Sequence, residues 1–155
     1  MTEFSGGCAC GEIRYRLSSE PMFVHCCHCT SCQTETGSAF VINALIESDR
    51  VEMIKGTPEP VLTPSESGKG QQIWRCASCR VALWSNYGGA TDILRFVRVG
   101  TLDTPGDLPP DIHIYIRSKL PWVQLPEGVP AVEAYYDSKT LWPEASLARR
   151  KVLFG

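Results

Sequence analysis

Apolar and polar residues alternate over several short stretches of this chain, and the alternation predicts β-strands. In residues 12–17, Ile13, Tyr15 and Leu17 share one face while charged residues occupy the other, which is the period of a half-buried strand. Residues 38–46 are apolar and contain several β-branched side chains, so they predict a more central strand. Further strands are predicted at residues 51–54, 71–75, 81–87, 93–99 and 112–116.

Glycine and proline interrupt the chain between these stretches. Residues 56–70 hold three glycines and three prolines with few apolar side chains, and this composition predicts a solvated loop. Residues 143–150 are typical of a short helix, with Pro143 at the first position and basic residues at the end. The whole pattern predicts a mainly β, mostly antiparallel domain with short helices.

Length and charge limit the classes of protein that remain. The 155 residues correspond to one domain, residues 1–155, and the 15 basic and 17 acidic residues give a net charge of −2, which makes nucleic acid an unlikely partner. The longest apolar stretch, residues 40–46, is far shorter than the roughly 20 residues of a membrane span. The first six residues offer neither a basic start nor an apolar segment, so we expect no membrane or secretory targeting and a cytoplasmic protein.

The eight cysteines fall into three tight groups. Cytosolic thiols stay reduced, and eight cysteines in 155 residues are sparser than in small disulfide scaffolds, so metal binding is the expected use. The groups are Cys8 and Cys10, then Cys26, Cys27, Cys29 and Cys32, then Cys76 and Cys79.

The turn Cys76-x-x-Cys79 lies between two predicted strands, as in the knuckles that hold structural zinc. Such a site needs two more ligands. Cys8 and Cys10 also precede a strand, and their two-residue step places both sulfurs on one side of an extended segment. We therefore expect one closed Cys₄ zinc site, which would stabilise a domain rich in loops. The alternative is a thioredoxin-like redox pair, which would need a helix where a strand is predicted.

Cys27, Cys29 and Cys32 can bring three thiolates to one ion from six consecutive residues. Three protein ligands leave a fourth position open, as in catalytic zinc sites. Three thiolates and Zn²⁺ carry a net charge of −1, so this metal would activate water poorly and exchange an incoming thiol readily.

The alternative for this second cluster is a closed site, with a fourth ligand from His28, His25 or Cys26. Because neighbouring residues of an extended chain point to opposite sides, His28 and Cys26 are expected to point away from the three ligands. Cys26 is then expected to be a small buried side chain.

The ordered cysteine motifs resemble the glutathione-dependent formaldehyde-activating enzyme family, which includes centromere-protein-V-like proteins. The matching segments are Gly7-Cys8-x-Cys10-Gly11, Cys27-His28-Cys29-x-x-Cys32, Gly37-Ser38-Ala39-Phe40, Arg75-Cys76-x-x-Cys79, Leu83-Trp84, Gly100-Thr101-Leu102-Asp103, His113-Ile114 and Lys119-x-x-Trp122. The resemblance implies a zinc-stapled β-tent of antiparallel sheets with short helices. It also implies a carbon–sulfur lyase that joins or splits glutathione and formaldehyde as an S-hydroxymethyl adduct.

The resemblance further implies two zinc ions per chain. By this resemblance, the ligands of the structural ion are Cys8, Cys10, Cys76 and Cys79, and those of the catalytic ion are Cys27, Cys29 and Cys32. One departure is Gln33, which stands where many family members carry a basic residue. An amide cannot stabilise an anionic cluster as a cation would, which bears on the affinity for a thiol.

A thiol bound at the open position would add to an aldehyde carbon, and the oxygen of the adduct would need a proton. His113, on the polar face of its predicted strand, and Ser38, beside the metal segment, are the candidate catalytic residues. An ordinary surface histidine is the alternative for His113. Trp122 is the candidate wall of the substrate pocket, whereas Trp84 is expected in the core.

Two other classes of function use the same cysteines. A zinc-ribbon-like module would present a surface to protein or nucleic acid, with a basic patch made of Arg14, Arg16, Arg95 and Arg98. A thiol-redox protein would cycle Cys27 and Cys32 between dithiol and disulfide. Edge strands allow a homodimer, although no residue pattern requires one.

Overall fold

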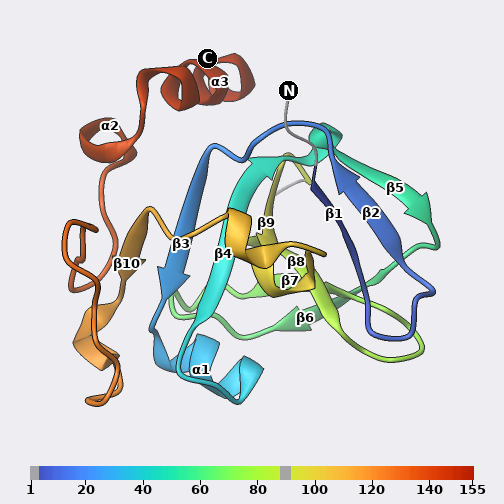
Figure 1. The fold of residues 1–155 in the computed structure, drawn as a ribbon, viewed down its shortest axis with the longest axis horizontal. Helices are drawn as coiled ribbons and strands as arrows, with labels where there is room; N and C mark the ends of the chain where they lie inside the picture. The colour runs from blue at the N-terminus through green and yellow to red at the C-terminus, as the bar shows by residue number, and fades with distance from the viewer. Residues whose placement is uncertain (1–3, 88–91) are drawn as a thin grey trace.

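The structure, a computed structural model that describes residues 4–87 and 92–155, contains two β-sheets and short helices (Figure 1). The smaller sheet has the order β1-β2-β5, with β1 (Phe4–Gly7), β2 (Arg14–Leu17) and β5 (Val51–Lys55). The larger sheet has the order β10-β3-β4-β9-β8-β7-β6. Its strands are β3 (Phe23–Cys27), β4 (Val41–Glu47), β6 (Glu59–Thr63), β7 (Gln71–Arg75), β8 (Ala82–Tyr87), β9 (Leu94–Arg98) and β10 (Ile112–Ile114). The predicted mainly β class is confirmed.

One hydrophobic core is shared by the two sheets. The predicted apolar face of β2 is confirmed, because Tyr15 and Leu17 are fully buried in this core. Trp84 of β8 lies in the same core, as expected, and its ring meets that of Tyr15 edge-on at 5.9 Å between centroids.

A second core includes side chains from β3, β4 and β10. All five residues of β3 are buried, and its side chains alternate between the two cores, with Val24 in the first and Phe23 and Cys27 in the second. Successive side chains of a strand point to opposite faces of the sheet, so Cys26 and Cys27 lie on different sides of it. This alternation separates the two neighbouring cysteines.

The helices are α1 (Thr30–Thr36), α2 (Ser138–Leu141) and α3 (Glu144–Phe154), with short 3₁₀ turns at η1 (Ser48–Arg50), η2 (Val99–Thr101), η3 (Pro105–Asp107) and η4 (Ile116–Ser118). The predicted C-terminal helix is confirmed, although Pro143 precedes its first turn and the helix continues to Phe154. Helix α1 was not predicted. It begins where the Cys29 side chain accepts from the Cys32 N–H, and it ends at Gly37 in the left-handed conformation.

Within the described ranges, every helix falls short of the length and apolar character that a bilayer crossing requires.

The structure corrects three predictions of strands and loops. The predicted loop 56–70 contains β6, which forms the exposed edge of the larger sheet and tolerates Pro60 there. Strands β1 and β3 were not predicted. The strand predicted at 112–116 ends at Ile114 because Tyr115 adopts φ +56°. Strand β10 pairs with β3 in parallel, whereas the other pairs of strands are antiparallel.

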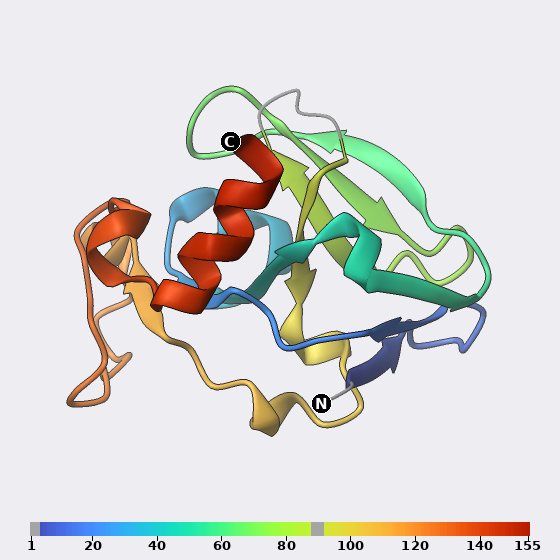
Figure 2. The same cartoon turned by 90° about the horizontal axis from the view of Figure 1, so that it is seen from above.

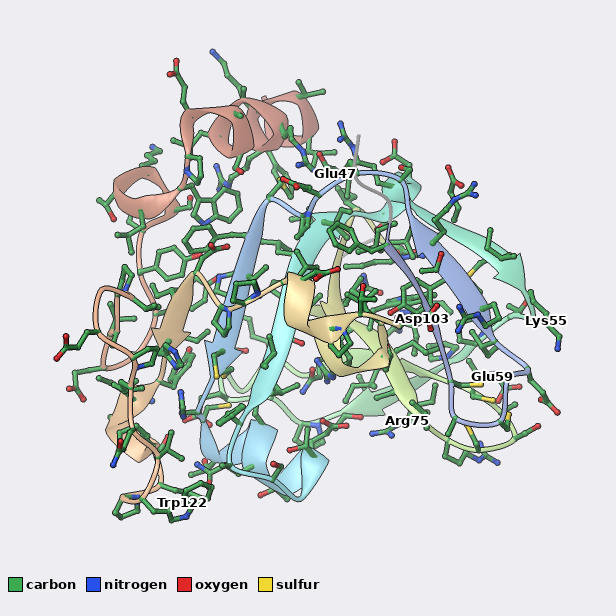
Figure 3. The ribbon with its side chains drawn as sticks, in the orientation of Figure 1. Glu47, Lys55, Glu59, Arg75, Asp103 and Trp122 are labelled. Carbon is green, nitrogen blue, oxygen red and sulfur yellow. The ribbon has the colours of Figure 1, made fainter. Side chains whose placement is uncertain are left out.

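Helix α3 (Figure 2) is attached by an ion pair to Glu47, the last residue of β4, which Figure 3 labels. Arg149 donates through Nε to Glu47 Oε1 at 2.8 Å and through Nη2 to Oε2 at 2.5 Å. Burial alone would raise the pKa of Glu47, but the hydrogen bonds from Arg149 and the charge of Arg50 outweigh it and lower the pKa below its ordinary value. The ionised pair therefore stabilises the docked helix.

We expect Glu47→Gln to lower the free energy of unfolding by about 2 kcal/mol at neutral pH, because hydrogen bonds to charged groups are lost. The folded-state pKa of Glu47 is the lower one, so its contribution is complete above the unfolded value of about 4.3 and disappears as pH falls through the folded value. Urea unfolding at several pH values should show a constant gap to the parent above pH ~5 and a shrinking gap below ~4. Glu52→Gln, in a more exposed pair with Arg16, is the control and should cost at most about 0.5 kcal/mol. A gap independent of pH would contradict the assignment.

Candidate metal centres and the adjoining cavity

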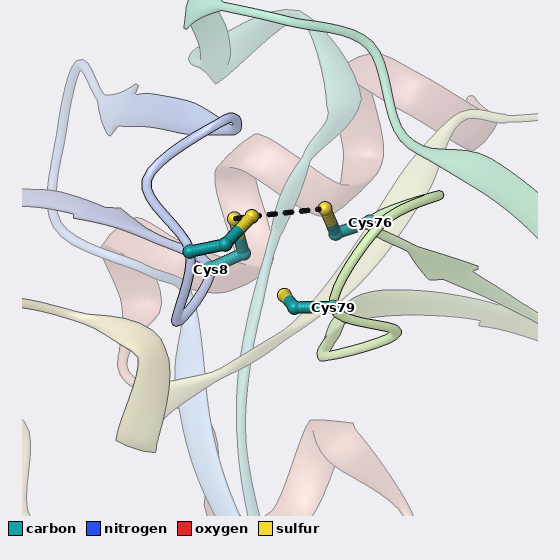
Figure 4. A group of neighbouring side chains, drawn as sticks. Cys8, Cys76 and Cys79 are labelled. Atoms are coloured by element: carbon teal, nitrogen blue, oxygen red, sulfur yellow. Dashed lines mark hydrogen bonds between the residues drawn. The ribbon is translucent and has the colours of Figure 1, made fainter.

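Cys8, Cys10, Cys76 and Cys79 come together, with all four sulfurs within 4.8 Å of one another (Figure 4). The Cys8 and Cys10 sulfurs are 3.5 Å apart, and those of Cys10 and Cys76 are 3.7 Å apart. Sulfurs around a tetrahedral ion with Zn–S bonds of about 2.3 Å stand about 3.8 Å apart. The backbone N–H groups of Val81 and Cys10 hold the pKa of Cys79 at about 6, below its ordinary value, which favours the thiolate form that binds metals.

Two tight turns place these four sulfurs. A Cβ atom at Gly7 would lie 2.2 Å from the Ile13 carbonyl oxygen, so only glycine permits the approach that positions Cys8. On the other side, Arg80 adopts φ +67° and its N–H donates to the Cys76 carbonyl at 3.0 Å. The chain thus folds the C-x-x-C segment into a knuckle, as the sequence predicted.

Cys27, Cys29 and Cys32 form a second group, also with all sulfurs within 4.8 Å of one another, and all three side chains are buried. Cys27 ends β3, and the other two flank the start of α1. The Cys32 N–H donates to Cys29 Sγ at 3.3 Å. The Cys27 and Cys32 thiols, with the Cys32 and Ser31 backbone N–H groups, hold the pKa of Cys29 far below its ordinary value. Both predicted ligand sets are therefore assembled, and both can hold a metal ion.

Cys26, His28 and His113 form a separate buried group. His28 Nε2 lies 2.9 Å from His113 Nδ1 and 3.6 Å from Cys26 Sγ. The prediction that Cys26 and His28 point away from the other three cysteines is confirmed. The expectation of an exposed polar face for His113 is wrong, since the residue is 7% exposed. Strand β10 has backbone partners on both edges, because it pairs with β3 on one edge, while on the other the His113 N–H donates to Pro130 and its carbonyl accepts from Val132.

A cavity of about 260 Å³ adjoins Cys27, Cys29 and Cys32. Five of the residues that line it carry rings, namely His25, Tyr87, Phe96, Tyr115 and Tyr135. Its polar lining includes Asn43, Gln71 and the loop residues Ser65, Glu66 and Ser67. The three thiols therefore face a space that a small molecule can enter.

The other predicted site residues lie outside the lining of this cavity. Ser38 is exposed just beyond the turn at Gly37 that ends α1. Trp122 is 71% exposed and projects from the periphery of the molecule (Figure 3). His113 belongs to the separate buried group. The geometry gives no support to the roles predicted for these three residues.

His25 lines the cavity and has a defined hydrogen-bond partner. Trp142 Nε1 donates to the Tyr136 hydroxyl oxygen at 2.7 Å, and that hydroxyl lies 2.5 Å from His25 Nε2. The contact with Tyr136 occupies Nε2, whereas the buried Nδ1 of His25 has no hydrogen-bond partner among the described residues. Burial also lowers the pKa of His25 to about 4, which keeps the ring neutral. His25 is not a member of the group formed by Cys27, Cys29 and Cys32, whose sulfurs all lie within 4.8 Å of one another, so neither of its ring nitrogens is placed as a fourth ligand here.

The side chain of Gln33 makes its hydrogen bonds to the backbone. Its Nε2 donates at 2.9 Å to the carbonyls of both His28 and Ser118, so it joins α1 to the segment after β10. The departure from the family pattern at this position has a structural use here.

The four arginines considered as a nucleic-acid-binding patch are all paired with carboxylates. The pairs are Arg14 with Asp103, Arg16 with Glu52, Arg95 with Asp92 and Arg98 with Glu35. Arg98 is buried and also donates to Asn43 Oδ1 at 2.6 Å. These residues do not form a free basic surface.

Fold and sites together define a small, mainly β protein with two cysteine clusters able to hold metal ions, one of them beside a cavity. Residues 3–118 match the family described as glutathione-dependent formaldehyde-activating enzyme, and the chain belongs to this family. A protein of Talaromyces marneffei is 25% identical over 142 residues, which cover 87% of this chain and 75% of the relative. A protein of Halomonas elongata is 25% identical over 127 residues, which cover 77% of this chain and 79% of the relative. Both bear the name "Putative glutathione-dependent formaldehyde-activating enzyme". A crystal structure of a Rhodobacter sphaeroides protein aligns with a TM-score of 0.45 at 17% identity, covering 64% of this chain and 87% of that one.

Proposed function

We propose that this protein is a cytoplasmic, zinc-dependent carbon–sulfur lyase that joins and splits a glutathione-type thiol and a small aldehyde such as formaldehyde. The observation that carries the proposal is the group of three buried thiols that lines a cavity and has no protein side chain as an evident fourth ligand in the described ranges. Family membership supports the thiol and the aldehyde as substrates.

Two zinc ions fit the donor sets. The spacing of the Cys8, Cys10 and Cys76 sulfurs matches a closed tetrahedral site, in which the metal would be part of the fold. Cys27, Cys29 and Cys32 would hold the second ion with one position open to the cavity. When bound there, zinc would lower the pKa of a substrate thiol and favour its thiolate.

The chain itself supplies enclosure and a proton donor. In the joining direction a carbon–sulfur bond forms between the thiol sulfur and the carbonyl carbon, and the proton lost by the thiol ends on the carbonyl oxygen. Tyr115 lines the cavity, and burial raises the pKa of its phenol, so the hydroxyl is protonated at neutral pH. It can pass its proton to that oxygen and take up the proton released by the thiol.

The backbone at Tyr115 supports a functional role for this residue. A tyrosine at φ +56° is strained, and the surrounding hydrogen bonds hold it there, with its N–H donating to Ala134 and its carbonyl accepting from Ser118. Strain of this kind is often retained where a side chain must point in one direction.

The test measures metal content and exchange on the same sample. Freshly purified protein should contain two equivalents of zinc. Two-dimensional exchange NMR of glutathione with formaldehyde should then show faster interconversion of free formaldehyde and S-hydroxymethylglutathione than in buffer alone. Protein that holds both metals and leaves the exchange rate unchanged would refute the proposed activity.

A further inference from the structure

The cavity is much larger than formaldehyde requires. Its volume is about 260 Å³, whereas one water molecule occupies about 30 Å³ in the liquid and formaldehyde has only two heavy atoms. The volume approaches the lower end of the range for small-molecule pockets, about 300 Å³. A reacting partner with a sizeable substituent can therefore fit beside Cys27, Cys29 and Cys32.

The rings that line the cavity form a continuous series. Tyr135 stacks on His25 with centroids 6.0 Å apart and lies 6.5 Å from Tyr115. His25 is 6.2 Å from Phe96, which meets Tyr87 edge-on at 4.8 Å. Rings packed in this way offer faces and edges on which a further aromatic ring binds favourably.

The charges around the cavity argue against an anionic occupant. Among the lining residues that the structure describes, Glu66 has the only carboxylate and none is a lysine or an arginine. Arg117 lies 3.4 Å from Glu66 but is largely exposed and outside the lining. Glutathione carries two carboxylates at neutral pH. Its charged ends are therefore better placed at the exposed side of the cavity, near Arg117, than in the interior.

We infer that the interior of the cavity binds an uncharged aromatic substituent, so that an aldehyde bearing an aromatic ring is a better substrate than one bearing a methyl group. This inference rests on the proposed function. The bond changes are those described above, with the aromatic group attached to the carbonyl side of the adduct.

Two glyoxals that differ only in this substituent provide the test. The metal-loaded protein is mixed with glutathione and, in separate runs, with formaldehyde, methylglyoxal or phenylglyoxal, and hemithioacetal formation is followed by stopped-flow absorbance or NMR above the uncatalysed rate. We expect kcat/KM for phenylglyoxal to exceed that for methylglyoxal by about tenfold or more, the discrimination an apolar pocket provides.

Tyr135→Leu tests whether the rings produce this preference. Tyr135 is half exposed, so the fold should tolerate the change, and the preference should fall to about twofold. Phe154→Leu on α3, also half exposed and outside the cavity lining, is the matched control and should keep the full preference.

Equal kcat/KM for the two glyoxals, with formaldehyde exchange accelerated, would overturn the inference and leave the proposed function standing. An undiminished preference in Tyr135→Leu would also overturn the assignment to these rings. Acceleration with none of the three aldehydes would overturn the proposed function and the inference together.

Discussion

Replacing Cys76 with serine is expected to unfold the protein at room temperature. Cys76 is fully buried in the core shared by the two sheets, and its sulfur stands 3.7 Å from that of Cys10. Structural zinc contributes roughly 10–16 kcal/mol of apparent binding free energy, while a domain's whole stability is about 5–15 kcal/mol. Losing one of four ligands, and burying an unpaired hydroxyl, should therefore exceed the stability margin.

Circular dichroism during thermal unfolding, with zinc measured on the same sample, checks this expectation. Ser78→Ala is the matched control, because Ser78 lies between Cys76 and Cys79, and its hydroxyl makes an exposed hydrogen bond to Glu12. Ser78→Ala should lower the free energy of unfolding by at most about 1 kcal/mol. A Cys76→Ser protein that lost one zinc and still melted at the parental temperature would show that the Cys₄ group does not hold the fold together.

The cysteine groups were predictable because their geometry is largely local. A C-x-x-C turn between two strands converges its sulfurs whatever the rest of the chain does, and the structure confirms that Cys76 and Cys79 lie together. Alternation along β3 likewise explains why Cys26 could be separated from Cys27 by sequence alone. That a metal occupies either group stays a prediction.

The proton-transfer residues could not be predicted because they depend on what covers each strand. The sequence predicts His113 on the polar face of an exposed strand. In the structure, β10 pairs in parallel with β3 and hydrogen-bonds to the segment around Val132, and His113 is buried. Ser38 is near the thiols in sequence, yet helix α1 and Gly37 carry the chain out to solvent before it. Neither effect has a local signal in the sequence.

The cavity was also beyond sequence reasoning, since its rings come from five separate segments. His25 is contributed by β3, Tyr87 by β8 and Phe96 by β9, while Tyr115 and Tyr135 follow later in the chain. Each ring alone is typical of a core residue. Only the order β3-β4-β9-β8 within the larger sheet brings the first three rings together around the thiols.

Cys29→Ser is expected to abolish activity while leaving the fold nearly intact. Cys76→Ser, in contrast, is expected to unfold the protein. Cys29 caps α1 by accepting from the Cys32 N–H at 3.3 Å, and a serine hydroxyl can make the same cap, so the helix start should survive. Serine is a much weaker zinc ligand than a thiolate, so one of the two metal equivalents should be lost. Since losing even an outer-shell partner of a metal ligand costs about 10–100-fold, the exchange rate should fall by about a hundredfold or more.

Metal content, thermal unfolding and exchange NMR on one preparation separate these effects, with Cys26→Ser as the neighbouring control. Cys26 lies on the opposite side of the sheet, near His28, and its replacement should keep both metals and most of the activity. If Cys29→Ser and Cys76→Ser lost structure alike, the division into a catalytic and a structural centre would be wrong. If Cys26→Ser lost the same metal as Cys29→Ser, the ligand set would have to include a residue from the other side of β3, and the open position beside the cavity would no longer exist.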